Sequence, residues 1–302
     1  MLTWLMMSVR LATPLLFAAL GGLLAERSGV FNFGLEGMML AGAFFAYAGS
    51  YFLGSPWAGL LLAVLIGMVS GLLLAYTSVN LGVSQMVVGI GINIFYLGLT
   101  SYLYRLMSSA AAGALSAPIF GDLRVPVLSR IPVIGTVLFH QNIMVYLCYI
   151  LVAVTWWFLF RTPTGLSYRS CGENPAAADS VGINVHLMRY AGCIASGALA
   201  AVGGSFLTLT QVSRFLENMV EGRGWIALTA VILGKWNPWG ALGACFLFGA
   251  ANALQMQMQI IGVNLPYQAV MMIPYILTIL ALVGVVGRVK GPAARGIPYF
   301  KQ

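Results

Sequence analysis

Residues 161–189, RTPTGLSYRSCGENPAAADSVGINVHLMR, interrupt an otherwise apolar chain. Only 7% of the whole sequence is charged, yet this stretch between two hydrophobic spans carries Arg161, Arg169, Glu173, Asp179 and Arg189. Charged side chains are costly in hydrocarbon and are rare within membrane segments. We therefore expect residues 161–188 to form a loop that leaves the membrane between two spans.

The middle of this loop predicts a short, capped helix. Asn174 suits the N-cap because its side-chain oxygen can accept a free backbone N–H, and Pro175 fits the first helical position. The alanines at 176–178 propagate the helix, and Gly182 can end it in a left-handed conformation. A helix of about two turns is marginal in water by itself. It therefore suggests a surface against which another protein docks.

The composition outside the loop is that of an integral membrane protein. The mean hydropathy is +0.92, and 60% of the residues are hydrophobic, whereas a soluble domain carries about 25% charged residues. Apolar runs recur that are long enough to cross about 30 Å of hydrocarbon. Their length and the lack of strict alternation favour helices over barrel strands. We expect one all-α, polytopic transmembrane domain over residues 1–302.

The apolar runs predict eight spans and two interruptions. The spans lie at about 10–25, 35–53, 57–78, 85–106, 142–160, 189–210, 238–258 and 266–287. A break is expected at 26–34, and a short helix that crosses part of the membrane at about 223–235. The long loop at 107–141 separates the fourth span from the fifth.

Charge sets the expected orientation. The tail carries Arg288, Lys290, Arg295 and Lys301, and positive residues favour the cytoplasmic side. Counting back from a cytoplasmic C-terminus places the 161–188 loop in the cytoplasm and the 107–141 loop outside, although arginines occur in the outer loop too. The chain holds 15 Lys and Arg against 7 Asp and Glu, a net charge of +8. We attribute this excess to topology and to contact with lipid headgroups, not to nucleic-acid binding.

The two halves of the chain, about 10–106 and 189–287, show a weak similarity. In each half an apolar helix ends, a Glu/Arg/Gly cluster follows and another apolar helix begins: ERSG at 26–29 and EGRG at 221–224. Inverted repeats with interrupted helices are typical of transporters. Convergent loop chemistry would give the same similarity, so both interpretations stay open.

Catalytic and metal-binding patterns are absent from the sequence. The two histidines, His140 and His186, have no Ser/Asp or Cys partner nearby, and the four cysteines show no metal-ligand spacing. The phosphate-binding pattern GxxxxGK[ST] does not occur. We therefore expect no enzyme activity, no metal and no cofactor, and any ATP that drives the protein must be hydrolysed by another polypeptide.

Uncharged polar residues inside the spans are candidates for a solute path. Gln85 and Asn93 lie at i and i+8 of one span, and Asn252, Gln255 and Gln259 lie at i, i+3 and i+7 of another. Each set falls on one helix face, where amides suit a neutral, hydrogen-bonding solute. Hydrogen bonds between helices are the alternative role.

Asn32 and Glu36 follow the first break by one turn and join the candidate path. Glu36 is the only acidic residue expected well inside a span, so its carboxylate must pair, take up a proton or face water. Arg27 and Arg223, from the two similar breaks, are the candidate partners. Either an ion pair that holds the broken helices or direct contact with solute fits this position.

Several blocks resemble a known family. They are GENPAAADSVGINVHLMRYAGCIASGALAAVGGSFL from residue 172, ERSGVFNFGLEGMMLAGAFFA at 26–46 and GRGWIALTAVILGKWNPWGALGACFLFGAANALQ at 222–255. Together they resemble the permease subunits of bacterial ABC importers for nucleosides and simple sugars, relatives of the ribose and branched-chain amino acid permeases. The motifs GENPAAA and GKWNPWGA point to the nucleoside-type branch.

The resemblance implies a transport subunit without ATPase activity in the bacterial inner membrane. Its partners would be a second permease, a cytoplasmic ABC ATPase and an external substrate-binding protein, and its cargo nucleosides or related neutral solutes. Simple sugars are the alternative cargo. A standalone ion-coupled transporter is the rival mechanism, which Glu36 alone supports poorly. Carried over by position, contact with the ATPase falls on Gly172, Glu173, Asn174, Pro175, Ala176, Ala177, Asp179 and Gly182.

Overall fold

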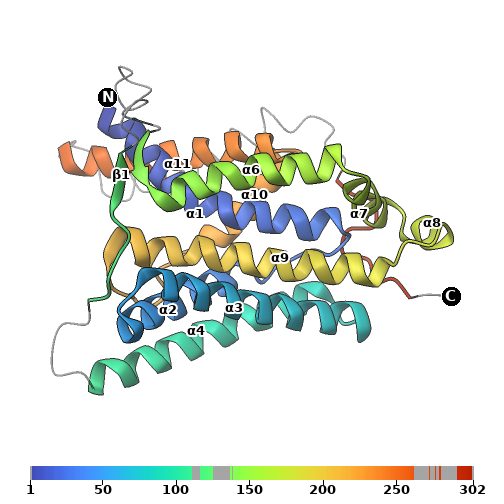
Figure 1. Ribbon diagram of the computed structural model, residues 1–302, viewed down its shortest axis with the longest axis horizontal. Coiled ribbons are helices and arrows are strands. Elements are labelled where there is room, and N and C mark those ends of the chain that lie inside the picture. Colours follow the sequence, from blue (N-terminus) through green and yellow to red (C-terminus); the bar gives the residue numbers. More distant parts are fainter. Residues whose placement is uncertain are drawn as a thin grey trace.

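A computed structural model describes residues 2–110, 116–124, 137, 139–261, 272, 276, 279 and 291–300 (Figure 1). The described chain is almost entirely helical, as predicted. Its helices are α1 (Leu2–Arg27), α2 (Leu35–Leu53), α3 (Pro56–Ala75), η1 (Tyr76–Asn80), α4 (Gln85–Ala110), α6 (Ile143–Arg161), α7 (Pro163–Glu173), α8 (Pro175–Ser180), α9 (Val185–Phe206), η3 (Leu207–Val212), α10 (Arg223–Leu233) and α11 (Pro238–Ile261). Two short antiparallel strands, β1 (Asp122–Arg124) and β2 (His140–Asn142), pair with Asp122 opposite Asn142.

Five helical stretches among the described residues are long and apolar enough to cross a membrane: Thr3–Arg27, Pro56–Asn80, Gln85–Ser109, Ile143–Arg161 and Val185–Val212. They match the first, third, fourth, fifth and sixth predicted spans. The helices α2 and α11 occupy the second and seventh predicted spans but are not among the five. The eighth, 266–287, lies almost wholly outside the described residues, so the count of eight spans stays a prediction.

The helix α9 is the centre of the bundle. It packs against α1 on one side and against α2 and α3 on the other, as Figure 1 shows. Small residues let these helices touch through their backbones, since a Cβ at Gly67 would lie 2.4 Å from the Gly197 carbonyl oxygen. Large apolar side chains on the outer faces of α3 and α4, such as Leu61 and Ile94, are exposed. Such a surface fits contact with hydrocarbon.

The bundle has two distinct ends. At one end the strands meet the start of α1, where Arg10 forms an ion pair of 2.7 Å with Asp122. At the other end α7 and α8 lie beside residues 291–300 (Figure 1). The tail and the charged loop therefore share one end, opposite β1 and β2, as predicted. Which end faces the cytoplasm stays a prediction.

Both predicted breaks are present, and they meet inside the protein. Residues 28–34 turn back from the end of α1 without forming a regular helix, and Asn32 reaches Ser196 near the middle of α9. The start of α10 lies against the start of α2, where a Cβ at Gly224 would be 2.5 Å from the Glu36 nitrogen. Irregular backbone at membrane depth is tolerated where protein surrounds it. The repeat of the two halves is not tested by this contact and stays a prediction.

Candidate functional site

The charged loop consists of consecutive capped helices. After α6 ends at Arg161, the Thr162 hydroxyl oxygen accepts the Gly165 N–H at 3.0 Å, and Pro163 occupies the first turn of α7. The interpretation of the sequence missed α7, although Thr162 followed by Pro163 is itself a helix-start signal. The helix α9 then begins at the Asn184 cap, whose side-chain oxygen accepts the Leu187 N–H at 3.0 Å.

Between α7 and α9 lies the predicted short helix. The Asn174 side-chain oxygen accepts the Ala177 N–H at 3.1 Å, and Pro175 is at the first position, which confirms both assignments. Gly182 adopts a φ of +85°, and the Ile183 N–H bonds back to the Ala178 carbonyl at 3.1 Å. This 6→1 bond is the Schellman ending that a left-handed glycine permits. The helix α8 is thus fixed at both ends by local chemistry.

The residues predicted to contact an ATPase differ in accessibility. Gly172 is buried, and Pro175 and Asp179 are partly buried. The remaining predicted residues are exposed at the tip of the bundle: Glu173, Asn174, Ala176, Ala177 and Gly182. The accessible set therefore runs along the outer side of α8 and its two ends, while Gly172 lies underneath.

The C-terminal tail is bonded to this loop. The Ala294 N–H donates to the Gly172 carbonyl at 2.9 Å, and the Tyr299 hydroxyl donates to the Asp179 carboxylate at 3.1 Å. The buried Arg189 at the start of α9 donates to the Ile297 carbonyl at 3.0 Å. Residues 291–300 thus connect the end of α7, the end of α8 and the start of α9. The charge pattern predicted the tail and the loop on the same side of the membrane, but no sequence signal predicted these contacts.

The same tail reaches the first break through an ion pair. Arg295 lies 2.8 Å from the carboxylate of Glu26, which is fully buried, and its guanidinium stacks over Trp236 at 5.0 Å. The Trp236 indole N–H donates to the same carboxylate, and the Arg27 guanidinium donates to the Trp236 carbonyl. The α8 end of α1, the α10–α11 turn and the tail are therefore joined at one point.

Three of the candidate path residues bind the first break instead of standing free. The Gln85 side-chain oxygen accepts the Phe31 N–H at 2.6 Å, and Asn93 accepts the Gly37 N–H at 2.7 Å. Asn32, fully buried, donates to Ser196 at 2.9 Å. These amides replace hydrogen bonds that the interrupted helix lacks. This favours a structural role, hydrogen bonding between segments, over contact with solute. The Gln85 side-chain nitrogen is buried without a partner among the described residues.

Glu36 has a different partner from the predicted arginines. Its two carboxylate oxygens accept the N–H groups of Gly222 and Gly224, each at 2.7 Å, at the start of α10. Within the described chain, Arg27 pairs with Glu173 at 3.8 Å and Arg223 donates to the Met219 carbonyl at 2.7 Å. Of the two predicted partners, Arg27 pairs elsewhere, whereas Arg223 interacts electrostatically with Glu36 but makes no hydrogen bond to it. A helix start presents free N–H groups and a positive dipole, which suit a carboxylate as well as a cation does.

The remaining path candidates lie on α11. Asn252 and Gln255 are partly buried, and Gln259 is exposed. Within the described residues none of the three side chains has a hydrogen-bond partner. These amides stay available to a solute, unlike those of α4.

Comparison with known proteins identifies the family of this chain. Residues 5–282 match the family described as the branched-chain amino acid transport system / permease component. The chain belongs to this family of permeases.

Named relatives of the permease cover nearly its full length. It is 40% identical to the guanosine ABC transporter permease protein NupQ of Bacillus subtilis (strain 168), over 96% of this chain and 94% of that protein. It is 38% identical to the nucleoside ABC transporter permease protein NupC of Lactococcus lactis subsp. cremoris (strain MG1363), again over 96% and 94%. A putative glucose ABC transporter permease protein of Haloferax volcanii, TsgC13, is 33% identical over 85% and 78%. No solved structure matches the permease.

Family membership fixes the broad class. The permease is a multi-pass membrane protein of a transport system and not an enzyme. Such subunits work with partner proteins, in general an ATPase that supplies the energy and a substrate-binding protein that delivers the solute.

Proposed function

We propose that this chain is the permease subunit of an ABC importer for nucleosides or related neutral solutes. The observation that carries this proposal is near full-length similarity, at 40% and 38% identity, to permeases named for guanosine and nucleosides. The relative named for glucose is more distant, at 33%, which supports a sugar as the second candidate cargo. Further partners in the proposal are a second permease, a cytoplasmic ATPase and an external binding protein.

The proposal places the α8 end in the cytoplasm. Basic side chains gather around this end, and positive residues favour the cytoplasmic side; those described are Arg27, Arg161, Arg169, Arg189, Lys235 and Arg295. The loop 161–188 would then meet the ATPase, and β1 and β2 would face outside. The accessible face of α8, around Ala176 and Ala177, is the part that would enter the ATPase surface.

Contacts of the tail supply a route for motion. When the ATPase moves α8, the bonds from Asp179 to Tyr299 and from Gly172 to Ala294 would carry the displacement to residues 291–300. Arg295 would pass it to Glu26 in α1 and to the α10–α11 turn. Packed elements joined in this way switch between discrete arrangements instead of bending gradually. Transport would alternate between outward-facing and inward-facing states.

The candidate path residues fall into two groups, those whose side chains are already hydrogen-bonded within the protein and those whose side chains are not. Four residues would hold the two breaks in register, because a side-chain oxygen of each accepts a backbone N–H: Asn32, Glu36, Gln85 and Asn93. The free amides on α11 would face solute: Asn252, Gln255 and Gln259.

Reconstitution tests the proposal. Proteoliposomes with this chain alone should take up neither guanosine nor glucose, with or without an ion gradient. Proteoliposomes with the complete transporter should take up guanosine when ATP and the loaded binding protein are present. Gradient-driven uptake by the chain alone would identify a secondary transporter and contradict the proposal. ATP-driven uptake of glucose in preference to guanosine would select the second candidate cargo.

A further inference from the structure

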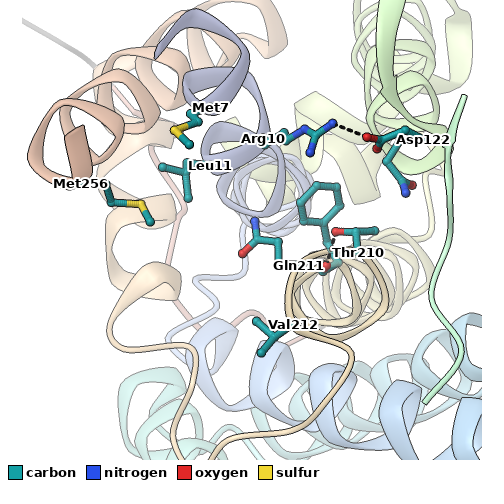
Figure 2. A pocket seen from close by; sticks show the side chains of 10 residues that line it. Met7, Arg10, Leu11, Asp122, Thr210, Gln211, Val212 and Met256 are labelled. Atoms are coloured by element: carbon teal, nitrogen blue, oxygen red, sulfur yellow. Dashed lines mark hydrogen bonds and ion pairs between the residues drawn. The ribbon is translucent and has the colours of Figure 1, made fainter. Parts of the chain in front are cut away.

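A cavity of about 380 Å³ lies beside Arg10 and Asp122, at the end of the bundle opposite α8, and Figure 2 shows the side chains that line it. It is open on one side and lined by α1, α11, η3 and the strand region, and its apolar walls include Met7, Leu11, Phe206, Val212 and Met256. Small-molecule pockets in proteins hold roughly 300–1,000 Å³ and are mostly apolar, with a few placed polar groups. The cavity is therefore of a size for one small solute and too small for a peptide.

The charged groups in the cavity already have partners. Arg10 donates to the Asp122 carboxylate at 2.7 Å and to the Gln141 side-chain oxygen at 3.0 Å. Asn142 caps α6 by accepting the Met144 N–H at 3.1 Å. Because the cation and the anion neutralise each other, the cavity does not favour a charged ligand. It suits a neutral one.

Gln211 is the exception among the polar lining residues. Its side chain is exposed and has no protein hydrogen-bond partner in the part of the chain that the structure describes, and Figure 2 shows it extending into the space beside Leu11 and Val212. An amide offers two donors and one acceptor without charge. That combination matches the ring nitrogens, carbonyls and hydroxyls of a neutral polar solute.

The backbone that places Gln211 is itself unusual. Gln211 belongs to the π-helix η3, which continues α9 and ends at Ser213 with a φ of +54°. π-Helical turns are rare and occur frequently at functional sites. An extra residue in the turn changes which side chains point toward the neighbouring elements, and here Gln211 lines the cavity together with Met7 and Leu11 of α1.

The opposite wall connects the cavity to the free amides of α11. Met256 lines the cavity, and Asn252 and Gln259 lie about one turn to either side of it on the same helix face. Met7 and Met256 provide flexible, polarizable contact surfaces, which favour aromatic rings. The wall is therefore suited to a planar base with hydrogen-bonding groups at its rim.

We propose that this cavity is a binding site for the transported solute on the external side of the permease, with Gln211 as its hydrogen-bonding group. The external placement and the nucleoside class rest on the function proposed above. The site itself rests on the cavity, its neutralised charges and the position of the solvent-accessible Gln211 amide on its wall.

Cysteine protection in the complete transporter tests the site. The native cysteines 148, 171, 193 and 245 are all buried, and burial also raises the pKa of the Cys171 thiol, so they should react little with a membrane-impermeant maleimide. In right-side-out vesicles Gln211→Cys should be labelled, and guanosine should slow its labelling at least about threefold. The matched control is Leu216→Cys, exposed in the loop that follows η3, whose labelling guanosine should not change.

Uptake kinetics give the second measurement. Gln211→Leu should raise the KM for guanosine about 3–10-fold, the loss of one neutral hydrogen bond, with the maximal rate retained. Gln211→Asn should recover part of the difference. The site would be overturned if neither guanosine nor glucose slows the labelling of Gln211→Cys and the KM of Gln211→Leu is unchanged. In that case guanosine uptake by the wild-type transporter would still support the proposed function. Protection by glucose and not by guanosine would keep the site and overturn the nucleoside assignment.

Discussion

Glu26 and Glu36 are two carboxylates at the same break, and the protein neutralises them in different ways. Glu26 is paired with Arg295, which comes from the C-terminal tail. Glu36 is held by two backbone N–H groups at the start of α10. The first arrangement depends on a side chain from a distant segment, while the second depends on how two helices meet. The stability of the buried Glu26 therefore depends on the position of the tail, and that of Glu36 depends on the contact between α2 and α10.

The largest effect is expected when the cation is removed from Glu26. Arg295→Ala leaves the buried Glu26 carboxylate with the Trp236 N–H but without a cation, which should lower the free energy of unfolding by about 3–5 kcal/mol. Thermal denaturation of the detergent-solubilised permease measures the loss. Adding Glu26→Gln should restore most of the stability, because the buried charge is then absent. If the double variant is as unstable as Arg295→Ala, the pair is not what Arg295 contributes.

A smaller loss is expected at Glu36. Glu36→Ala leaves the Gly222 and Gly224 N–H groups without acceptors, which should cost about 2–4 kcal/mol, and Glu36→Gln should cost less because its amide oxygen still accepts one of them. The same denaturation measurement applies. Arg223→Ala is the comparison for Arg295→Ala, since Arg223 interacts with Glu36 only electrostatically, without the direct hydrogen bond that joins Arg295 to Glu26. A rescue of Arg223→Ala by Glu36→Gln would show that Glu36 depends on a cation after all.

These two carboxylates also show how far the sequence could be interpreted. The cap at Asn174, the proline after it and the turn at Gly182 are local signals within nine residues, and they predicted α8 correctly. The partner of Glu36 lies 186 residues away and consists of backbone N–H groups, which no side-chain pattern reveals. A charge argument therefore selected arginines. The cavity around Gln211 was equally invisible, because its walls come from segments far apart in the chain.

The cap of α8 gives a third prediction, with a larger effect on transport than on stability. Asn174→Ala removes the bond to Ala177 and should weaken the N-terminus of α8 by about 1 kcal/mol. Because α8 has only six residues, its shape should suffer more than that of a long helix. ATP-driven uptake by the reconstituted transporter should fall several-fold at unchanged permease content.

Asn184→Ala is the matched control for this cap. Asn184 makes the same type of bond, to Leu187, but it begins the 22-residue helix α9, which packs through the bundle. Uptake should be nearly normal in this variant. Equal losses in both variants would mean that α8 has no special part in coupling.

The smallest effect is expected at the outer bond of the tail. Tyr299→Phe removes the hydroxyl that donates to Asp179 and keeps the ring, so stability should fall by about 0.5–1 kcal/mol at most. If the tail carries motion from α8 to Glu26, the ratio of solute transported to ATP hydrolysed should fall more than the ATPase rate does. Asp179→Asn retains an oxygen that accepts the Tyr299 hydroxyl and should be closer to the unmodified protein. A normal ratio in Tyr299→Phe, combined with a lowered ratio in Arg295→Ala, would place the route of motion at Gly172 and Ala294 instead of at this bond.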